Sequence, residues 1–223
     1  MATGTTPSRR RRRPGRPAES DSDLRERLLD ASLARFVAEG IAATSLKSIA
    51  TQAGVTPALV HYYFGNKAQL VAAVIEERLL VVTAELRGLI GEDKGDGDPS
   101  ALVRDFVQGL GSVVARHPWL PVLWAREVLT EGGALREVML TRVAPMLPQM
   151  MAARFARAQQ AGNLNPALDP RLLVVSLIGL TLFPLAAESI WRRLFDAGDI
   201  DHKRLQQHTI ALLERGLETD HAH

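Results

Sequence analysis

Residues 46–67, LKSIATQAGVTPALVHYYFGNK, constrain the fold of this chain more than any other stretch. Apolar residues recur at helical spacing up to Ala53, and Gly54 then supplies a residue that tolerates positive φ at a helix end. A second helix is expected from Pro57, because a missing N–H costs nothing at the first helical position, and Thr56 is its expected N-cap. This order predicts a helix-turn-helix, whose second helix enters the major groove of DNA.

The same pattern also fits an ordinary corner between two packed helices. The content of the second helix favours DNA binding over this alternative. His61, Tyr62 and Tyr63 are three consecutive polar-tipped rings, and consecutive residues lie around a helix instead of on one face. A helix that only packs against its neighbours would leave some of these rings facing water without a partner.

The composition is that of an ordinary globular protein. The chain is 46% hydrophobic and 23% charged over 223 residues, which is enough to bury a core in one domain or two. It contains no cysteine, so disulfides and thiolate metal sites are excluded. The longest apolar run, residues 172–187, is shorter than the roughly 20 residues that cross a bilayer. The segment that follows Met1 has no apolar stretch, so a secretion signal is not expected. We therefore expect a cytoplasmic protein that does not enter a membrane.

Positive charge is concentrated at the N-terminus. Residues 1–20 hold six arginines and one acidic residue, which leaves 21 basic and 24 acidic residues, a net charge of −3, in the rest of the chain. The segment is poor in apolar residues and is expected to be disordered by itself. Arginine runs bind phosphates and narrow minor grooves, so the tail is a candidate DNA contact, although a merely solvated tail fits the same composition. The arginines expected to touch DNA are Arg11, Arg12, Arg13 and Arg16.

The periodicity in the rest of the chain predicts helices and no strands, which is an all-α fold. One helix is expected over Asp21–Glu39, where Gly40 ends it. Another should begin near Asn66 and extend toward Leu89. Residues 21–90 are thus expected to form one domain. The apolar residues of the last helix expected to face inward are Leu70, Val74, Leu80 and Val81.

Gly91–Ser100, GEDKGDGDPS, is predicted to be a linker loop between this domain and residues 101–223. Its aspartates superficially suggest a calcium loop, but twelve-residue windows from Asp93 or Asp96 do not end in the required glutamate. Beyond the linker further helices are expected, and prolines should kink or split two of them. The expected ranges are 101–116, 120–130, 135–161 with Pro145 and Pro148 inside, 170–196 with Pro184 inside, and 200–217.

The region Arg25–Glu77 resembles the TetR family of bacterial transcriptional regulators. His61 departs from the family pattern, since many members carry tyrosine there, and this leaves the base preference at that position open. The resemblance implies a helix-turn-helix domain followed by a helical effector-binding and dimerisation domain. It rests on the combined spacing of Leu28, Leu29, Asp30, Ala31, Phe36, Gly40, Thr44, Ile49, Ala50, Ala53, Gly54, Val55, Tyr63, Phe64, Lys67 and Leu70.

The resemblance also implies which residues touch DNA. An ammonium group can reach guanine O6 or N7, and proline or alanine offers apolar contact to a thymine methyl, whereas hydroxyls and lysine suit phosphates. The alternative for each residue is surface or core packing alone. The residues expected in the groove are Lys47, Pro57, Ala58 and His61, with Thr56 at the helix start, and the expected phosphate contacts are Tyr62, Tyr63 and Lys67, helped by Thr44 or Ser45.

The C-terminal half resembles the family's effector-binding domains only loosely. The run Leu172–Ala187 is so apolar that most of its circumference must be covered. In the family, the last two helices of each subunit form a four-helix dimer interface, and burial inside a monomer is the alternative. A small-molecule effector is expected among the C-terminal helices, where it would change the separation of the two recognition helices. The candidate pocket residues, each of which could be plain core, are Trp119, Trp124, Arg126, Met139, Met150, Phe155 and Phe183.

No catalytic motif is present, since the sequence lacks a GxSxG, a P-loop and a dinucleotide fingerprint. Glu127 and Glu131 share a helical face near Arg126, which is more typical of an exposed or paired surface than of a catalytic pair. The histidines lack metal-site spacing, so no enzyme activity, metal or cofactor is expected. A non-specific DNA-organising protein is the main alternative, but an apolar pocket domain argues against it. The sequence predicts a homodimeric repressor that binds a palindromic double-stranded DNA operator and is released by a small-molecule effector.

Overall fold

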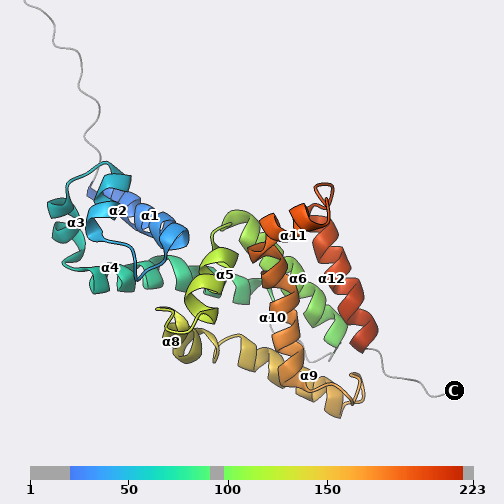
Figure 1. Cartoon of the computed structure of the whole chain (residues 1–223). Helices are drawn as coiled ribbons and strands as arrows, with labels where there is room; N and C mark the ends of the chain where they lie inside the picture. The colour runs from blue at the N-terminus through green and yellow to red at the C-terminus, as the bar shows by residue number, and fades with distance from the viewer. Residues whose placement is uncertain (1–20, 91–97, 218–223) are drawn as a thin grey trace, which may run out of the picture.

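The computed structural model describes residues 21–90 and 98–217, and in these ranges the chain is all-α, as predicted, with no strand (Figure 1). Four helices form the N-terminal part at one end of the molecule. A π-helical turn, η1 (Ile75–Leu79), then continues the fourth helix into α5 (Leu80–Leu89) without a break. The four helices are α1 (Asp21–Glu39), α2 (Leu46–Ala53), α3 (Pro57–Phe64) and α4 (Lys67–Val74).

The C-terminal part contains the remaining helices, and two of the predicted helices are split there. The predicted helix 135–161 is interrupted where its prolines lie, because proline removes a backbone donor and clashes with the preceding turn. The predicted helix 170–196 is bent by 75° between its two segments. The elements are α6 (Pro99–Arg116), α7 (Leu120–Trp124), η2 (Ala125–Leu129), α8 (Arg136–Val138), η3 (Met139–Val143), α9 (Pro148–Gln160), α10 (Pro170–Ala186), α11 (Glu188–Leu194) and α12 (His202–Leu217), where η2 and η3 are π-helical turns.

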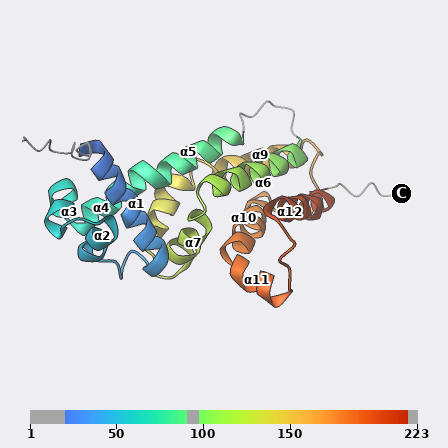
Figure 2. The same ribbon diagram turned by 90° about the horizontal axis from the view of Figure 1, so that it is seen from above.

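Two apolar cores hold the molecule together, and the boundary between them falls inside the continuous rod α4–η1–α5. The N-terminal core is built on α1, and Ile75 of η1 is its last member on the rod. From Val82 onward the rod packs into the C-terminal core, where α5, α6 and α9 run side by side (Figure 2). Leu123 and Leu135 lie beyond the linker, yet they are buried in the N-terminal core. The two parts therefore share packed side chains as well as one helix.

Side-chain caps begin several of the helices. The Asn66 side chain accepts the Gln69 N–H at 3.0 Å, and Asp98 and Asp169 accept the N–H groups of Ser100 and Arg171 at 2.9 and 2.8 Å. Each cap satisfies a backbone donor that has no partner within its helix, which stabilises the helix start at that position.

One inward-facing residue and one boundary were predicted wrongly, whereas Leu80 packs against the N-terminal core as expected. Val81 is 57% exposed, and its neighbour Val82 is buried instead, because the π-helical turn before α5 shifts the phase of the helix. Helix α6 begins at Pro99, which is favoured at a first helical position, so the predicted linker ends two residues earlier than expected. Its residues 91–97 lie outside the described residues, as does the arginine-rich segment 1–20.

Among the described helices, none is by itself long and apolar enough to cross a bilayer. Helices α10 and α11 together meet that length and composition, but the chain bends by 75° where they meet.

Candidate DNA interface and effector pocket

The turn between α2 and α3 has the local geometry that the sequence predicts. Ser45 begins α2 in a reciprocal capping box, in which its hydroxyl accepts the Ser48 N–H at 3.0 Å and the Ser48 hydroxyl accepts the Ser45 N–H at 3.2 Å. Gly54 ends α2 at φ 70° and ψ 32°, the left-handed conformation that glycine adopts without strain. The Val55 N–H then bonds to the Ala50 carbonyl at 2.9 Å, which fixes the direction in which α3 leaves.

Helix α3 divides into a buried side and an exposed side. Val60 and Phe64 are buried in the N-terminal core, whereas Pro57, Ala58 and His61 are exposed. These three expected groove residues lie on the solvent side of α3, at and after its N-terminus, the end from which a recognition helix reads bases.

The His61 ring is held in a defined tautomer. Its Nδ1 lies 2.7 Å from the Gly65 carbonyl oxygen, which only accepts hydrogen bonds, so Nδ1 carries the proton and donates. In the neutral ring, Nε2 is then an acceptor. An acceptor in the major groove suits the amino group of adenine or cytosine.

The expected phosphate contacts lie on or beside α3, and they differ in the hydrogen bonds that they already make. Tyr62 is 77% exposed and stands edge-on to Tyr63, with ring centroids 5.3 Å apart. The Tyr63 hydroxyl donates to the carboxylate of Asp21 at the start of α1, and it would have to exchange that bond for a phosphate. The Lys67 ammonium donates to the Ala42 carbonyl at 2.8 Å, and two of its three protons stay available for a phosphate.

Two threonines do not have the predicted roles. Thr44 is 2% exposed, and its hydroxyl donates to the Gly40 carbonyl at 2.7 Å, so it closes the α1–α2 turn and cannot reach a phosphate. Thr56 occupies the N-cap position of α3 but makes no side-chain capping bond. Ser45 and Lys47 are exposed at the start of α2. Arg11, Arg12, Arg13 and Arg16 lie outside the described residues.

Ion pairs attach α1 to the rod and so fix the helix-turn-helix on it. Arg25 and Glu77 form a bidentate pair with distances of 2.5 and 2.6 Å. The Arg25 hydrogen bonds lower the pKa of the Glu77 carboxyl group below its ordinary value. Arg78 joins the same surface of α1, contacting Glu26 at 2.7 Å and Asp30 at 2.9 Å. Because η1 carries both Glu77 and Arg78, these ion pairs join η1 directly to α1.

The C-terminal part contains an apolar pocket of about 100 Å³, which we call the central pocket. Its walls come from α5, α6, α7, η3, α9 and α10. None of the lining side chains is charged, and only Thr83 and Trp124 carry a hydroxyl or N–H group. The lining residues are Val82, Thr83, Leu86, Phe106, Leu110, Leu120, Trp124, Met139, Val143, Leu147, Pro148, Met151, Ile178 and Leu182.

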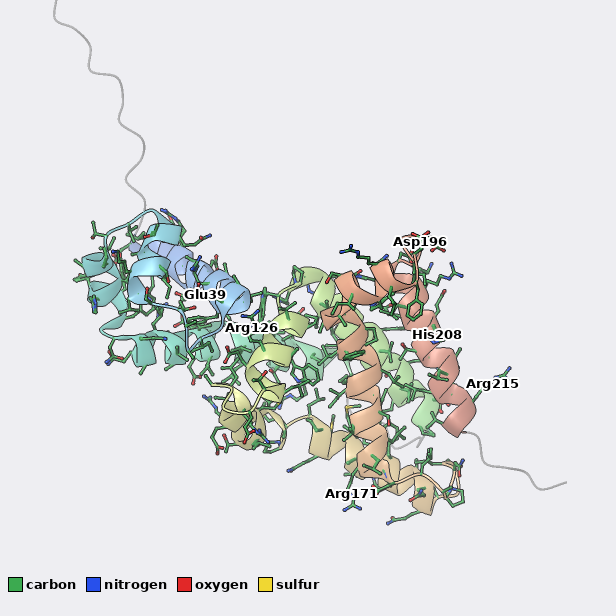
Figure 3. All side chains as sticks on the ribbon, in the orientation of Figure 1. Glu39, Arg126, Arg171, Asp196, His208 and Arg215 are labelled. Atoms are coloured by element: carbon green, nitrogen blue, oxygen red, sulfur yellow. The ribbon has the colours of Figure 1, made fainter. Side chains whose placement is uncertain are left out.

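Of the candidate pocket residues, only Trp124 and Met139 line the central pocket. Trp119 packs against both apolar cores, and Met150 packs against the C-terminal one. Phe155 is fully buried in that core, where α9 presents Met151 to the pocket instead. The other two candidates lie away from the pocket. Arg126 is at the junction with α1, labelled near Glu39 in Figure 3, and Phe183 is 64% exposed on α10.

The buried carboxylate of Glu127 connects the two parts of the molecule. It is 5% exposed, and its oxygens accept the N–H of Ile41 at 2.8 Å and the N–H of Ala134 at 3.1 Å. The interpretation of Glu127 as an exposed or surface-paired residue is therefore wrong. A Cβ on Gly40 would lie 3.2 Å from the same carboxylate, and the φ of Gly40 is 89°, so glycine is required beside it. The glycine was visible in the sequence, but its distant partner was not.

In the described parts of the chain, no group of three or more histidine, cysteine, aspartate or glutamate side chains could hold a metal ion. Two candidate sites stand out among the described residues: an exposed helix start with polar-tipped rings, and an apolar pocket beside the rod that carries this helix.

The fold and these two sites define a helix-turn-helix DNA-binding protein with a pocket in a separate helical part. Residues 28–74 match the family model described as "Bacterial regulatory proteins, tetR family". Over these residues the chain matches the TetR family, and it is a transcriptional regulator.

Relatives extend the similarity beyond the helix-turn-helix. The chain is 25% identical to the HTH-type transcriptional repressor SCO4008 of Streptomyces coelicolor, over 82% of this chain and 88% of that protein. It is 28% identical to the HTH-type transcriptional regulator RutR of Escherichia coli, over 72% of this chain and 73% of that one. The ketosteroid transcriptional regulator KstR2 of Mycobacterium tuberculosis superposes with a TM-score of 0.69 at 18% identity, covering 92% of this chain and all of that one. This structural likeness shows the shared fold.

Proposed function

We propose that this protein is a ligand-responsive repressor, which binds a palindromic operator as a homodimer and releases it when a small molecule occupies the central pocket. The observation that carries the DNA role is the exposed N-terminal half of α3, held by a capped, glycine-ended turn against a buried core. Repression, rather than activation, is supported by the similarity to the Streptomyces relative, which is a transcriptional repressor.

The exposed face of α10 supports the homodimer. Leu172, Val175 and Phe183 are 63%, 64% and 64% exposed, and together with Gly179 they recur at helical spacing along one face. A side chain at Gly179 would meet nothing within 4 Å, so this face is open in a single chain. Exposed apolar side chains gathered on one face are typical of an interaction site. Leu212 of α12 adds to it at 54% exposed, consistent with dimerisation through the end of the chain.

The central pocket supports ligand control because of its place in the fold. Val82, Thr83 and Leu86 of the rod line it, and the same rod carries η1, whose Glu77 and Arg78 hold α1. A ligand that displaces the rod would therefore move the helix-turn-helix of each subunit. We assign no enzyme activity and no cofactor, and we place the protein in the cytoplasm, where an operator is accessible.

Footprinting on the DNA flanking the gene tests the proposal. We expect protection with a dyad, with half-sites about one helical turn apart, or somewhat farther apart if two dimers share the operator. Protection without a dyad would contradict dimeric recognition. Equal affinity for operator and random DNA would instead favour the alternative, a non-specific DNA-organising protein.

Light scattering with matched variants tests the dimer. Val175→Glu should give a monomer at micromolar concentration, because it places a charge in the proposed interface. Val81→Glu is the control, since Val81 is similarly exposed, at 57%, but lies on α5. Monomeric wild-type protein, or a dimer that persists in Val175→Glu and dissociates in Val81→Glu, would contradict the assigned surface.

A further inference from the structure

We propose that the central pocket selects an uncharged, compact and largely apolar molecule and discriminates strongly against carboxylates and phosphates. The inference rests on the proposed function, because it names the class of effector for the same pocket. Its basis is the lining itself, in which no residue is charged and only two side chains carry a hydroxyl or N–H group.

The polar groups at the pocket can satisfy a neutral ligand but not an anion. The Thr83 hydroxyl donates to the Leu79 carbonyl at 3.0 Å, so towards a ligand it serves as an acceptor. Trp124 supplies an indole N–H donor. A carboxylate or phosphate needs several donors or a cation, and burying it unpaired is strongly unfavourable. The nearest arginine along the chain from the pocket wall, Arg142 beside Val143, is already paired with Glu76.

The size of the pocket favours a compact molecule. An engineered apolar cavity of about 150 Å³ holds benzene, and the central pocket, at about 100 Å³, is somewhat smaller. A ring-sized ligand therefore fits only if lining side chains move and enlarge the pocket. Met139 and Met151 line the pocket, and methionine side chains adapt to irregular volumes more readily than branched ones.

The pocket wall formed by η3 also connects the ligand to the DNA-binding part. Met139 and Val143 lie in η3, and Arg142 of the same π-helical turn bonds to Glu76 of η1, between α4 and α5. Displacement of η3 by a ligand would thus pull on η1 through this ion pair. The pocket wall and the rod that positions α3 are joined by a charged contact in addition to apolar packing.

Calorimetric titration of the full chain with toluene, benzyl alcohol and benzoate tests the ligand class. At pH 7 we expect toluene and benzyl alcohol to bind, and benzoate to bind at least roughly 100-fold more weakly, because a carboxylic acid with a pKa near 4.3 must first be protonated. Lowering the pH to 5 should narrow the gap between benzoate and toluene by about tenfold per pH unit. Benzoate binding as tightly as toluene at pH 7 would overturn the proposal.

Variants place the binding in this pocket. Val143→Phe should fill it and abolish toluene binding, whereas Val81→Phe, on the exposed side of α5, should bind toluene as the wild type does. Thr83→Val keeps the shape of the side chain and removes its acceptor, so it should weaken benzyl alcohol relative to toluene by about 2- to 10-fold. The last variant tests the pocket even if Val143→Phe does not fold. Toluene binding that survives in a folded Val143→Phe protein would overturn the assignment. An unchanged ratio of benzyl alcohol affinity to toluene affinity in Thr83→Val would overturn it as well.

Failure of the ligand class and failure of the proposed function give different results. Sequence-specific DNA binding by the ligand-free protein, together with tight benzoate binding, would overturn only the ligand class. Absence of sequence-specific DNA binding would overturn the repressor function, whatever the probes do.

Discussion

Replacement of Glu127 tests whether its buried carboxylate holds the two parts of the molecule together. In Glu127→Gln, one side-chain oxygen remains and can accept only one of the two backbone N–H groups of Ile41 and Ala134 in the present geometry. The other N–H group then faces the new NH₂, which is also a donor. Hydrogen bonds to charged groups contribute about 1.5–3 kcal/mol each, so the free energy of unfolding should fall by about that amount. Glu127→Ala loses both bonds, so its free energy of unfolding should fall by roughly twice as much.

Urea denaturation at neutral pH measures this loss, and thermal unfolding provides a second measurement. For a chain of this size about 1 kcal/mol corresponds to roughly 2–4 °C, so Glu127→Gln should lower Tm by about 3–12 °C. Glu131→Gln is the matched control, because Glu131 is exposed and lies four residues farther along the chain, in the turn after η2. The same free energy of unfolding for the Glu127→Gln and Glu131→Gln variants, within about 0.5 kcal/mol, would refute the reasoning.

Three further predictions concern DNA binding and pH. Lys67→Ala should weaken binding to all DNA sequences alike and reduce the salt slope by about 1, whereas His61→Ala should change the preference at one position per half-site, where a wrong base costs about 1–3 kcal/mol; identical binding profiles would contradict both roles. Deletion of residues 1–17 should lower affinity for operator and random DNA by a similar factor and reduce the salt slope by roughly 0.9 per lost phosphate contact. Unchanged affinity at physiological salt would show that the tail does not contribute to DNA binding. Because the pKa of Glu77 is lowered by Arg25, the pair stabilises the fold above the ordinary carboxyl value of 4.5, and this contribution is lost as the pH falls through the lowered pKa. Denaturation should therefore show wild type about 0.5–1 kcal/mol more stable than Glu77→Gln at pH 6, a modest difference for a partly exposed pair, and no difference at strongly acidic pH; a pH-independent difference would contradict the assigned pair.

The helices and the helix-turn-helix were predictable because short-range interactions determine them. Gly54 ends α2 through its own backbone freedom, and Asn66 begins α4 through a hydrogen bond to a residue three positions later. The break near Pro145 and Pro148 likewise follows from the covalent structure of proline. The π-helical turns were not predicted, and the one before α5 reversed the expected burial of Val81 and Val82.

The pocket was less predictable because it depends on how helices are rotated against each other. Aromatic and methionine residues on the C-terminal helices were all reasonable candidates, and the sequence cannot say which side of α9 faces a neighbour. The packing turns Met151 toward the central pocket and Phe155 into the core, although both are apolar and one helical turn apart.

The sequence by itself determined that this chain is an all-α regulator with a helix-turn-helix near its N-terminus, because caps, glycines and the helical period act over a few residues. Only the tertiary structure decided that Glu127 is buried against Ile41, that Thr44 faces inward, and that the pocket wall carries no charge. The contact between Glu127 and Ile41 joins residues 86 positions apart, and chain packing determines such contacts jointly for all the helices.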